Sequence, residues 1–395
     1  MTAEGRTGIT EAVPGTVAWV DDPGYWAVAS HPVVASISAD PDRFCSGRGI
    51  LLDEIGASYD APPTMMHTDP PAHTVYRALV QPAFGRRRMA LLEPSIRDRV
   101  RPIVAALSDG ETHDVVDELA VPVPIHVIIE LLGCAEVADV ERVRTWSDAA
   151  IPDAVEMTDD ERMAAMGDMI ATLLGVAARR RTDPADDVLS ELATAELTGE
   201  DGTVNRLDDT ELAMFGVQLV VAGNETTRNA IAGGLVALCE HPEQWEELTL
   251  PHANSDAGRG DLIALAVEEI LRWTSPVVSF MRTATADVHL PLPGGGGVDV
   301  RSGDPLLLLY GRANRDPAEF GSSADRFLVR RSPNHHLAFG FGAHFCLGAA
   351  LARLELRVVL EELLATGTSP ALAGPVRRSP SRIIDGIESA PMRFT

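Results

Sequence analysis

Apolar residues recur along most of this chain at the three- and four-residue spacing of amphipathic helices. The pattern predicts helices over about 70–83, 94–107, 114–132, 138–150, 160–181, 185–197, 208–240, 261–273 and 346–366. Strand-like runs are fewer and shorter, at 25–29, 283–290, 305–310 and within the last 20 residues. The sequence therefore predicts a mainly α protein with a small β part.

The chain has 395 residues, of which 45% are hydrophobic, enough for a large core. It has no internal repeat and no Pro/Gly/Ser linker that would separate domains, so we expect one domain over 1–395 with a short N-terminal segment, 1–24. No apolar run reaches the roughly 18 residues of a membrane span, and residues 1–15 do not resemble a signal peptide. We therefore expect a cytoplasmic monomer without a membrane anchor.

Charge and cysteine content argue against several classes of protein. The net charge of −25 at pH 7 disfavours nucleic acid and anionic membranes as partners. The four cysteines, Cys45, Cys134, Cys239 and Cys346, are far apart and form no C-x-x-C pair. Neither a disulfide framework nor a zinc site is therefore expected.

A glycine-rich stretch leads into the last predicted helix: Phe339-Gly340-Phe341-Gly342-Ala343-His344-Phe345-Cys346-Leu347-Gly348. A lone cysteine is most often a small buried hydrophobic residue. At the start of a helix, however, backbone N–H groups and the helix dipole favour the thiolate. Glycines let the backbone approach a flat group, and Phe339 offers an aromatic face to it. An anionic sulfur beside a flat apolar surface indicates axial ligation of haem iron by Cys346.

This loop resembles the haem-binding signature of the cytochrome P-450 family, F-G-x-G-x-H-x-C-x-G, at every fixed position. The likeness runs from about residue 25 to the end, and the first helix of the family is expected to be shortened or absent. It implies the triangular cytochrome P-450 fold, with haem b between the long central helix and the helix after the cysteine loop. It also implies that the Cys346 thiolate is the fifth iron ligand. Phe339, Gly340 and Gly348 would then lie against the haem.

The helix predicted over 208–240 carries polar residues inside an apolar stretch. Thr226 could bond back to a carbonyl of the preceding turn, in a satisfied polar patch. Alternatively, the helix is kinked where it crosses a cofactor, with Gly223 leaving a groove for a diatomic ligand. The segment is similar to the family motif (A/G)-G-x-(D/E)-T. The resemblance implies that Ala222 faces the haem, that Thr226 bonds the bound dioxygen and that Glu225 relays protons to it.

Haem carries two propionate carboxylates, which need cationic or hydrogen-bonding partners. Two candidates, His73 and Arg77, stand four residues apart on one side of a predicted helix. Solvated side chains on a helix begun by proline would give the same pattern. The segment resembles the family's D-P-P-x-H-x-x-x-R, which implies that His73 and Arg77 bind the propionates. Arg282 and His344 match two further propionate ligands of the family.

Glu269 and Arg272 lie three residues apart within an apolar helical segment. Most pairs of this kind are surface salt bridges of little energetic value. The pair resembles the family's E-x-x-R motif, which braces the cysteine loop together with another arginine. The resemblance implies that Arg326 is this third member, with Arg315 as the alternative.

Position in the family fold implies a substrate pocket of mostly aliphatic side chains. The residues expected in it are Met65, Met66, Val221, Val277, Val278 and Ile384. Methionine makes an adaptable apolar wall, so we expect a lipophilic small molecule. A sterol, a terpenoid, a fatty acid and a secondary-metabolite intermediate all fit, and the sequence does not choose among them.

The chain contains no G-x-G-x-x-G nucleotide fingerprint, so its electrons must come from another protein. The resemblance to soluble bacterial members implies a ferredoxin or flavodoxin with an NAD(P)H-dependent reductase. Two arginine groups, 86–88 and Arg353 with Arg357, either dock an acidic ferredoxin or form a solvated basic turn.

The sequence thus predicts a haem-thiolate monooxygenase that uses O2 and electrons to hydroxylate or epoxidise a lipophilic molecule. Two alternatives stay open. One is a haem protein of the same fold that binds ligands without activating oxygen. The other is an enzyme that uses the same oxidant for coupling, desaturation or nitration. Glu225 and Thr226 favour oxygen activation, because splitting the O–O bond needs delivered protons.

Overall fold

The computed structural model describes residues 12–55, 64–151, 157–198, 202–250, 256–379, 381 and 383–395. The chain packs as two compact units. The first unit comprises Met1–Thr74, Leu271–Arg326 and Ser332–Cys346, and the second comprises Val75–Ile270, Phe327–Arg331 and Leu347–Thr395. The expectation of one domain over the whole chain stays a prediction. The shortened first helix is expected partly in residues that lie outside the described ranges.

The first unit is built on a five-stranded sheet. In spatial order its strands are β1 (Val17–Val20), β2 (Tyr25–Val28), β10 (Pro305–Leu309), β7 (Ser279–Ala284) and β3 (Phe44–Cys45). Strand β10 runs parallel to β2 and antiparallel to β7. Its leucines are buried on both faces, because Leu306 and Leu308 enter one apolar core and Leu307 and Leu309 enter another.

Smaller elements complete this unit. They are α2 (His31–Ser38), η3 (Met65–His67), the hairpin of β8 (Val288–Pro291) with β9 (Gly297–Val300), α12 (Tyr310–Ala313), α13 (Pro317–Phe320) and η8 (Gly342–His344). Helix α2 packs its buried residues Val33, Val34 and Ile37 into the same core as Leu306 and Leu308. The core therefore holds the segment before the cysteine loop, since Leu337 belongs to it too.

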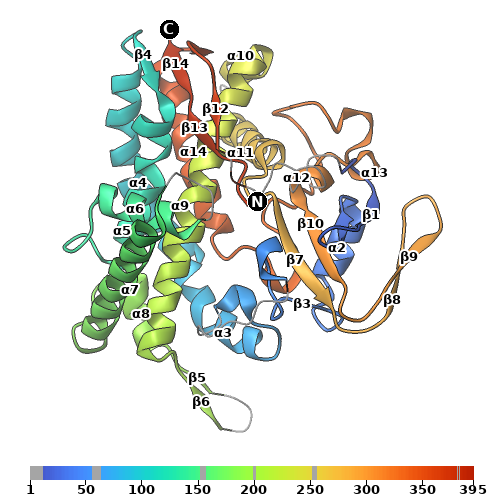
Figure 1. Ribbon diagram of the computed structural model, residues 1–395. Coiled ribbons are helices and arrows are strands. Elements are labelled where there is room, and N and C mark those ends of the chain that lie inside the picture. Colours follow the sequence, from blue (N-terminus) through green and yellow to red (C-terminus); the bar gives the residue numbers. More distant parts are fainter. Residues whose placement is uncertain are drawn as a thin grey trace. The chain divides into compact units, whose positions relative to one another are not determined.

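The second unit is mainly helical. Its longer helices are α4 (Arg86–Leu107), α5 (Pro122–Leu132), α6 (Val140–Ala150), α7 (Asp159–Thr182), α9 (Asp209–Glu240) and α14 (Ala349–Thr366). Shorter ones are α8 (Val188–Thr194) and α10 (Pro242–Thr249), while α3 (Ala72–Val80) and α11 (Asp256–Thr274) each contain a boundary between the units. Helix α9 packs against α5, α6, α7 and α14 (Figure 1). This explains why most of its residues are buried.

Short strands lie beside these helices. A three-stranded sheet has the order β11 (Pro370–Leu372), β14 (Pro391–Phe394) and β4 (Thr112–Asp114), and two small pairs are β12 (Arg377–Arg378) with β13 (Ile387–Ser389) and β5 (Leu197–Thr198) with β6 (Val204–Asn205). The prediction of a mainly α protein with a small β part is confirmed. Within the described residues, no helix combines the length and hydropathy needed to cross a membrane.

Some predicted boundaries are wrong. Helix α4 begins at Arg86 rather than at 94, and Pro94 lies inside it. The helix tolerates this proline because a stripe of buried residues, including Leu92, Ile96 and Val100, continues along it and packs on α14. The strand expected over 283–290 is divided, because β7 ends at Ala284 and β8 begins at Val288.

Candidate functional site

The cysteine loop is held by its own backbone hydrogen bonds. The Cys346 N–H donates to the Phe339 carbonyl oxygen at 2.9 Å, and the Gly340 N–H donates to Leu337 at 2.9 Å. Gly340 and Gly342 have φ values of +68° and +71°, a region that favours glycine. At Gly342 a Cβ would also overlap the Ser38 carbonyl oxygen. Two of the loop glycines are therefore required by its shape.

Asn314 anchors the start of this loop. Its side-chain oxygen accepts from the Leu337 N–H at 2.7 Å, and its Nδ2 donates to Ser275 Oγ at 2.8 Å. The side chain is fully buried, so both polar ends are satisfied without water. Asn314 thus braces the start of the loop against Ser275.

Cys346 differs from the other three cysteines in exposure. Cys45 and Cys134 are buried, Cys239 is half-buried, and Cys346 is exposed. Burial raises the pKa of the Cys45 thiol, and it raises the pKa of Cys134 to about 11 and that of Cys239 to about 12. These three thiols are therefore protonated at neutral pH and unsuited to bind a metal.

Aromatic residues stand close to Cys346 in the loop sequence. Phe341 and Phe345 of the loop are 48% and 39% exposed, which is unusual for large apolar side chains. The Phe339 and Phe345 rings lie 6.1 Å apart between centroids. An exposed sulfur flanked by exposed rings, on a backbone shaped by glycine, fits a flat apolar group with a metal at its centre.

Helix α9 exposes a short stretch of its middle. Ala222 is exposed and Thr226 is half-buried, whereas the adjacent Val220 and Asn224 are buried. Thr226 Oγ1 donates to the Ala222 carbonyl oxygen at 2.7 Å, as the local interpretation predicts. A Cβ at Gly223 would lie 2.6 Å from Ile128 Cδ1, and the groove expected at this glycine stays a prediction. This glycine lets α5 pack closely, and the exposed position is Ala222.

Glu225 is buried beside this stretch and is 5% exposed. Its Oε1 accepts from Arg228 Nη1 at 2.8 Å, and its Oε2 lies 3.4 Å from Asn229 Nδ2. Burial raises the pKa of the Glu225 carboxyl, while Arg228 counteracts this effect. A raised pKa favours the protonated form of the carboxyl, which is the form that a general acid needs.

Three of the four residues predicted to bind propionates belong to the first unit. The His73 and His344 rings lie 4.2 Å apart between centroids, so the structure brings these two together. His344 Nε2 lies 3.2 Å from Ser46 Oγ, a partner that sequence analysis misses. Arg282 is buried on β7, with Nη1 donating to the Met281 carbonyl at 2.7 Å. Arg77 is half-buried on α3 in the second unit.

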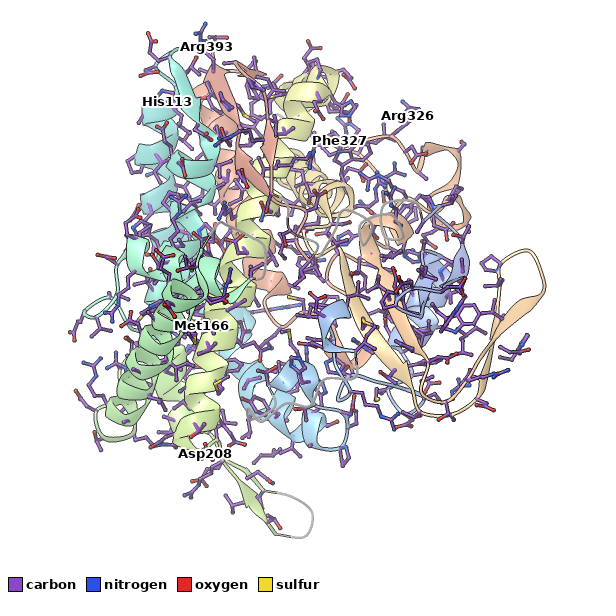
Figure 2. The ribbon with its side chains drawn as sticks, viewed as in Figure 1. His113, Met166, Asp208, Arg326, Phe327 and Arg393 are labelled. Carbon is purple, nitrogen blue, oxygen red and sulfur yellow. The ribbon has the colours of Figure 1, made fainter. Side chains whose placement is uncertain are left out.

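The scaffold pair has different partners from those expected. Glu269 Oε2 lies 3.0 Å from Arg331 Nε, and Glu269 Oε1 accepts from the Leu328 N–H at 2.7 Å. Arg272 donates to the carbonyls of Asn314, Ala324 and Arg326. The side chain of Arg326 is exposed (Figure 2), so this residue contributes its backbone carbonyl. Arg331, which sequence analysis misses, is the buried arginine that pairs with Glu269.

Arg315, the alternative third member, lies elsewhere. Its guanidinium lies 4.5 Å from the centroid of the Trp273 ring and donates to the Trp273 carbonyl at 3.0 Å. This contact holds the end of α11.

Most of the arginines expected to form a docking surface are paired with carboxylates. Arg88 is buried and contacts Asp186 and Glu191. Arg353 binds Glu268 through two hydrogen bonds of 2.6 and 2.7 Å. Arg357 lies 2.8 Å from Glu93 and 3.0 Å from Glu361. Acidic side chains of the chain itself thus bind these three arginines, and their docking of a ferredoxin stays a prediction. Arg86 and Arg87 are exposed at the start of α4.

The residues predicted to line the pocket fall into both units, so each is described in its own surroundings. Met65 is buried and Met66 half-buried in η3, and Val277 and Val278 are half-buried just before β7. Val277 packs against the core of the first unit. In the second unit, Val221 is half-buried on α9 and Ile384 is buried before β13. Their role in a pocket stays a prediction.

This chain is similar to a protein-family model, to named relatives and to solved structures. The family model for cytochrome P-450 matches residues 156–366. A steroid C26-monooxygenase of Mycolicibacterium smegmatis is 34% identical over 381 residues, which cover 95% of this chain and 89% of that protein. A methyl-branched lipid omega-hydroxylase of Mycobacterium tuberculosis is 36% identical over 400 residues, covering 98% of this chain and 87% of that protein.

A solved structure has the same fold. A cytochrome P-450 of Mycobacterium marinum in complex with pseudoionone has a TM-score of 0.81 and 33% sequence identity, and the match covers 100% of this chain and 96% of that one. The family model spans more than half of the chain, and the relatives align over nearly all of it. The chain therefore belongs to the cytochrome P-450 family and is a haem-thiolate monooxygenase with haem b as its cofactor.

Proposed function

We propose that Cys346 is the iron ligand of this monooxygenase, that Thr226 hydrogen-bonds the bound oxygen ligand, and that Glu225 relays protons to it during the oxidation of a lipophilic substrate. Exposure of the cysteines is the observation that carries the assignment. The family requires a cysteine thiolate, and Cys346 is the one exposed thiol of the four. When bound, haem supplies the reduction of O2 and the transfer of one oxygen atom to the substrate.

The Thr226 hydroxyl is placed to accept a hydrogen bond. Its hydroxyl proton is engaged by the Ala222 carbonyl, so its lone pairs are free to accept a hydrogen bond from a ligand over the exposed face of α9. Glu225 precedes it and is buried with a raised pKa. Thr226 would position the ligand, and Glu225 would replace the proton that the ligand takes up.

Four residues are proposed to hold the propionates: His73, Arg77, Arg282 and His344. Arginine pairs strongly with carboxylate because both groups are planar and can form two parallel hydrogen bonds. The contact between the His73 and His344 rings supports a shared role for the two histidines. Ser46 would fix the orientation of the His344 ring.

The iron ligand can be tested by spectroscopy. In Cys346→Ser, the Soret band of the reduced carbon monoxide complex should leave the position typical of thiolate ligation. The matched control is Cys239→Ser, which changes a half-buried thiol and should keep the wild-type band. A Cys346→Ser protein with an unaltered thiolate spectrum would disprove the assignment.

Proton delivery can be tested by measuring coupling. Thr226→Ala should divert reducing equivalents into peroxide and lower the product formed per NAD(P)H consumed. Thr226→Ser keeps a hydroxyl at the same backbone position and should retain most of the coupling. Equal coupling in the wild type and in Thr226→Ala would remove Thr226 from the mechanism.

For the substrate we propose a sterol or a methyl-branched lipid, oxidised at an aliphatic carbon. The names of the two relatives support this class, as do the apolar Met65 and Met66. A titration that follows the Soret shift would compare cholesterol, a methyl-branched fatty acid and a terpenoid alcohol. Submicromolar binding of the terpenoid alone would redirect the assignment to terpenoids.

For the electron donor we propose a ferredoxin or flavodoxin, with Arg86 and Arg87 in its docking surface. Cations in the first turn of a helix oppose the helix dipole, so their presence at the start of α4 calls for another role. Reversing both charges should slow reduction and weaken its salt dependence. Arg99→Glu changes an exposed arginine later on the same helix and is the control.

A further inference from the structure

A buried cluster of charged side chains connects α6 with α9 inside the second unit. Arg228 Nη1 lies 2.8 Å from Glu225 Oε1 and 3.8 Å from Asp148 Oδ1. The three side chains are 10%, 6% and 15% exposed, respectively. One guanidinium therefore faces two carboxyl groups in surroundings that contain little water.

The cluster contains more acidic groups than basic ones. Two ionised carboxylates and one arginine would leave a net negative charge in a low-dielectric interior, which is unfavourable. Binding one proton makes the cluster neutral. In agreement, burial raises the pKa of both Asp148 and Glu225, and the charge of Asp148 raises that of Glu225 further. The proton belongs to the pair rather than to one member.

Neighbouring groups do not remove this imbalance. Arg144 Nε lies 4.0 Å from Asp148, but Arg144 also pairs with Asp117 at 3.0 Å. Glu141 adds a negative charge on the same helix and raises the pKa of Asp148 further. Asn229, on the α9 side, is neutral and donates to the Glu225 carbonyl oxygen at 2.8 Å.

The exposure of the charged side chains decreases from the surface toward α9. Side-chain exposure falls from 53% at Asp117 and 34% at Arg144 to 15% at Asp148 and 6% at Glu225. Glu225 is followed in sequence by Thr226, whose hydroxyl lies over the exposed turn of α9. The charged groups therefore lead from the surface of the second unit to the middle of α9.

We propose that Asp148 takes up protons from solvent and passes them to Glu225, with Arg228 holding the two carboxyls together. This inference rests on the proposed role of Glu225. A proton from water binds the Asp148 carboxylate and then moves to the Glu225 carboxylate, through one water or a side-chain rotation. Asp148 is left ionised against Arg228 and is ready for the next proton. Asp148 acts through Glu225 and touches neither substrate nor haem.

The polar atoms nearby are suited to hold such a water. Ser147 Oγ, Asn224 Oδ1 and Arg228 Nε are buried and have no hydrogen-bond partner within the described part of the chain. Buried polar atoms of this kind usually bind ordered water. All three belong to α6 or α9, the helices that carry the two carboxyls.

The first test does not depend on turnover. Infrared spectra of the resting enzyme in H2O and D2O would be compared for wild type, Asp148→Asn and Glu225→Gln. A shared proton requires that either substitution remove the same protonated-carboxyl band, because the remaining carboxylate then pairs with Arg228. Asp117→Asn, which alters the outer partner of Arg144, should keep the band. A band that persists in Asp148→Asn and disappears only in Glu225→Gln would overturn the inference.

The second test measures turnover. Asp148→Asn should lower product formation on the order of tenfold and increase the solvent isotope effect, because proton uptake becomes slower. Asp148→Glu restores the carboxyl and should recover both, which separates proton transfer from loss of structure if the asparagine variant folds poorly. Wild-type rate and isotope effect in Asp148→Asn would refute the proposal. If Glu225→Gln also has wild-type turnover, the proposed role of Glu225 fails as well; if it is slow, only the role of Asp148 fails.

Discussion

Glu269 Oε2 lies 3.0 Å from Arg331 Nε, and both side chains are buried within the second unit. The same carboxylate also receives the Leu328 N–H, so it holds the turn that contains Arg331. Removing one member of a buried ion pair leaves the other charge without compensation. This pair therefore stabilises the fold through the arginine that lies five residues after Arg326.

Replacing Arg331 by alanine should lower the free energy of unfolding by about 3–5 kcal/mol, the usual cost of breaking a buried pair from one side. Urea denaturation of the haem-loaded protein measures this change. Arg326→Ala is the control, because the exposed side chain should contribute within about 0.5 kcal/mol. A larger loss in Arg326→Ala than in Arg331→Ala would show that the two arginines have been assigned to the wrong roles.

Two loop glycines should respond differently to the same substitution. Gly340→Ala and Gly342→Ala both place a side chain at a positive φ, at roughly 1–2 kcal/mol. Gly342→Ala adds an overlap with the Ser38 carbonyl oxygen, whereas the nearest atom to a Cβ at Gly340 is 3.8 Å away. We expect Gly342→Ala to lose haem during gel filtration and Gly340→Ala to retain most of it. Equal retention would argue against the close approach to Ser38.

Local patterns in the sequence are sufficient for the long helices. The prediction of a helix over 208–240 agrees with α9. Both signals for this helix are local in sequence: the apolar periodicity, and the Asp208 side chain that accepts a hydrogen bond from the Glu211 N–H. The start of α4 is not predictable in this way. Pro94 resembles a helix start, and only the packing on α14 shows that the helix continues through it.

Contacts between distant segments are the part that sequence reasoning misses. Ser46 and His344 are 298 positions apart, and no local pattern links them. From the sequence, Arg326 and Arg331 look equally suitable as partners of Glu269. The fold of the turn between them decides which of the two side chains is buried. No local pattern singles out Asp148, because the arginine that it faces, Arg228, lies on another helix.

His113 should make stability depend on pH at one edge of the second unit. His113 lies in β4, next to β14 (Figure 2), and its ring nitrogens lie 2.9 Å from Asp109 Oδ1 and 2.9 Å from Glu118 Oε2. Hydrogen bonds that His113 donates to Asp109 and Glu118 raise the pKa of His113. The stabilisation is fully present below the unfolded pKa, about 6.5, and is lost as pH rises through the folded pKa.

His113→Gln should therefore lower the urea midpoint at about pH 5.5 and change it much less at about pH 9. The wild-type protein, measured at both values, supplies the reference for all other titrating groups. Asp109→Asn should give part of the same loss at the lower pH. A destabilisation by His113→Gln that is equal at both pH values would mean that packing, and not charge, is the contribution of this histidine.

Two carboxyls on α14, Glu355 and Glu362, have pKa values shifted in opposite directions. Glu355 is buried, its Oε2 has no hydrogen-bond partner among the residues described, and burial raises its pKa well above the usual value. The stability that its neutral form provides is complete below about pH 4.3 and is lost as pH rises through the folded pKa. Burial also acts on Glu362, but hydrogen bonds from Arg101 and Arg97 lower its pKa overall.

The opposite pKa shifts of Glu355 and Glu362 predict opposite results for two matched substitutions. Glu355→Gln should be more stable than the wild type at about pH 9, and its advantage should shrink toward about pH 5, because the amide has no proton to lose. Glu362→Gln should be less stable than the wild type at neutral pH, since its ionised form binds two arginines. Urea midpoints of the haem-loaded proteins across this range measure both effects. A Glu355→Gln protein that is destabilised most at high pH would show that the carboxyl is ionised and paired in the folded state.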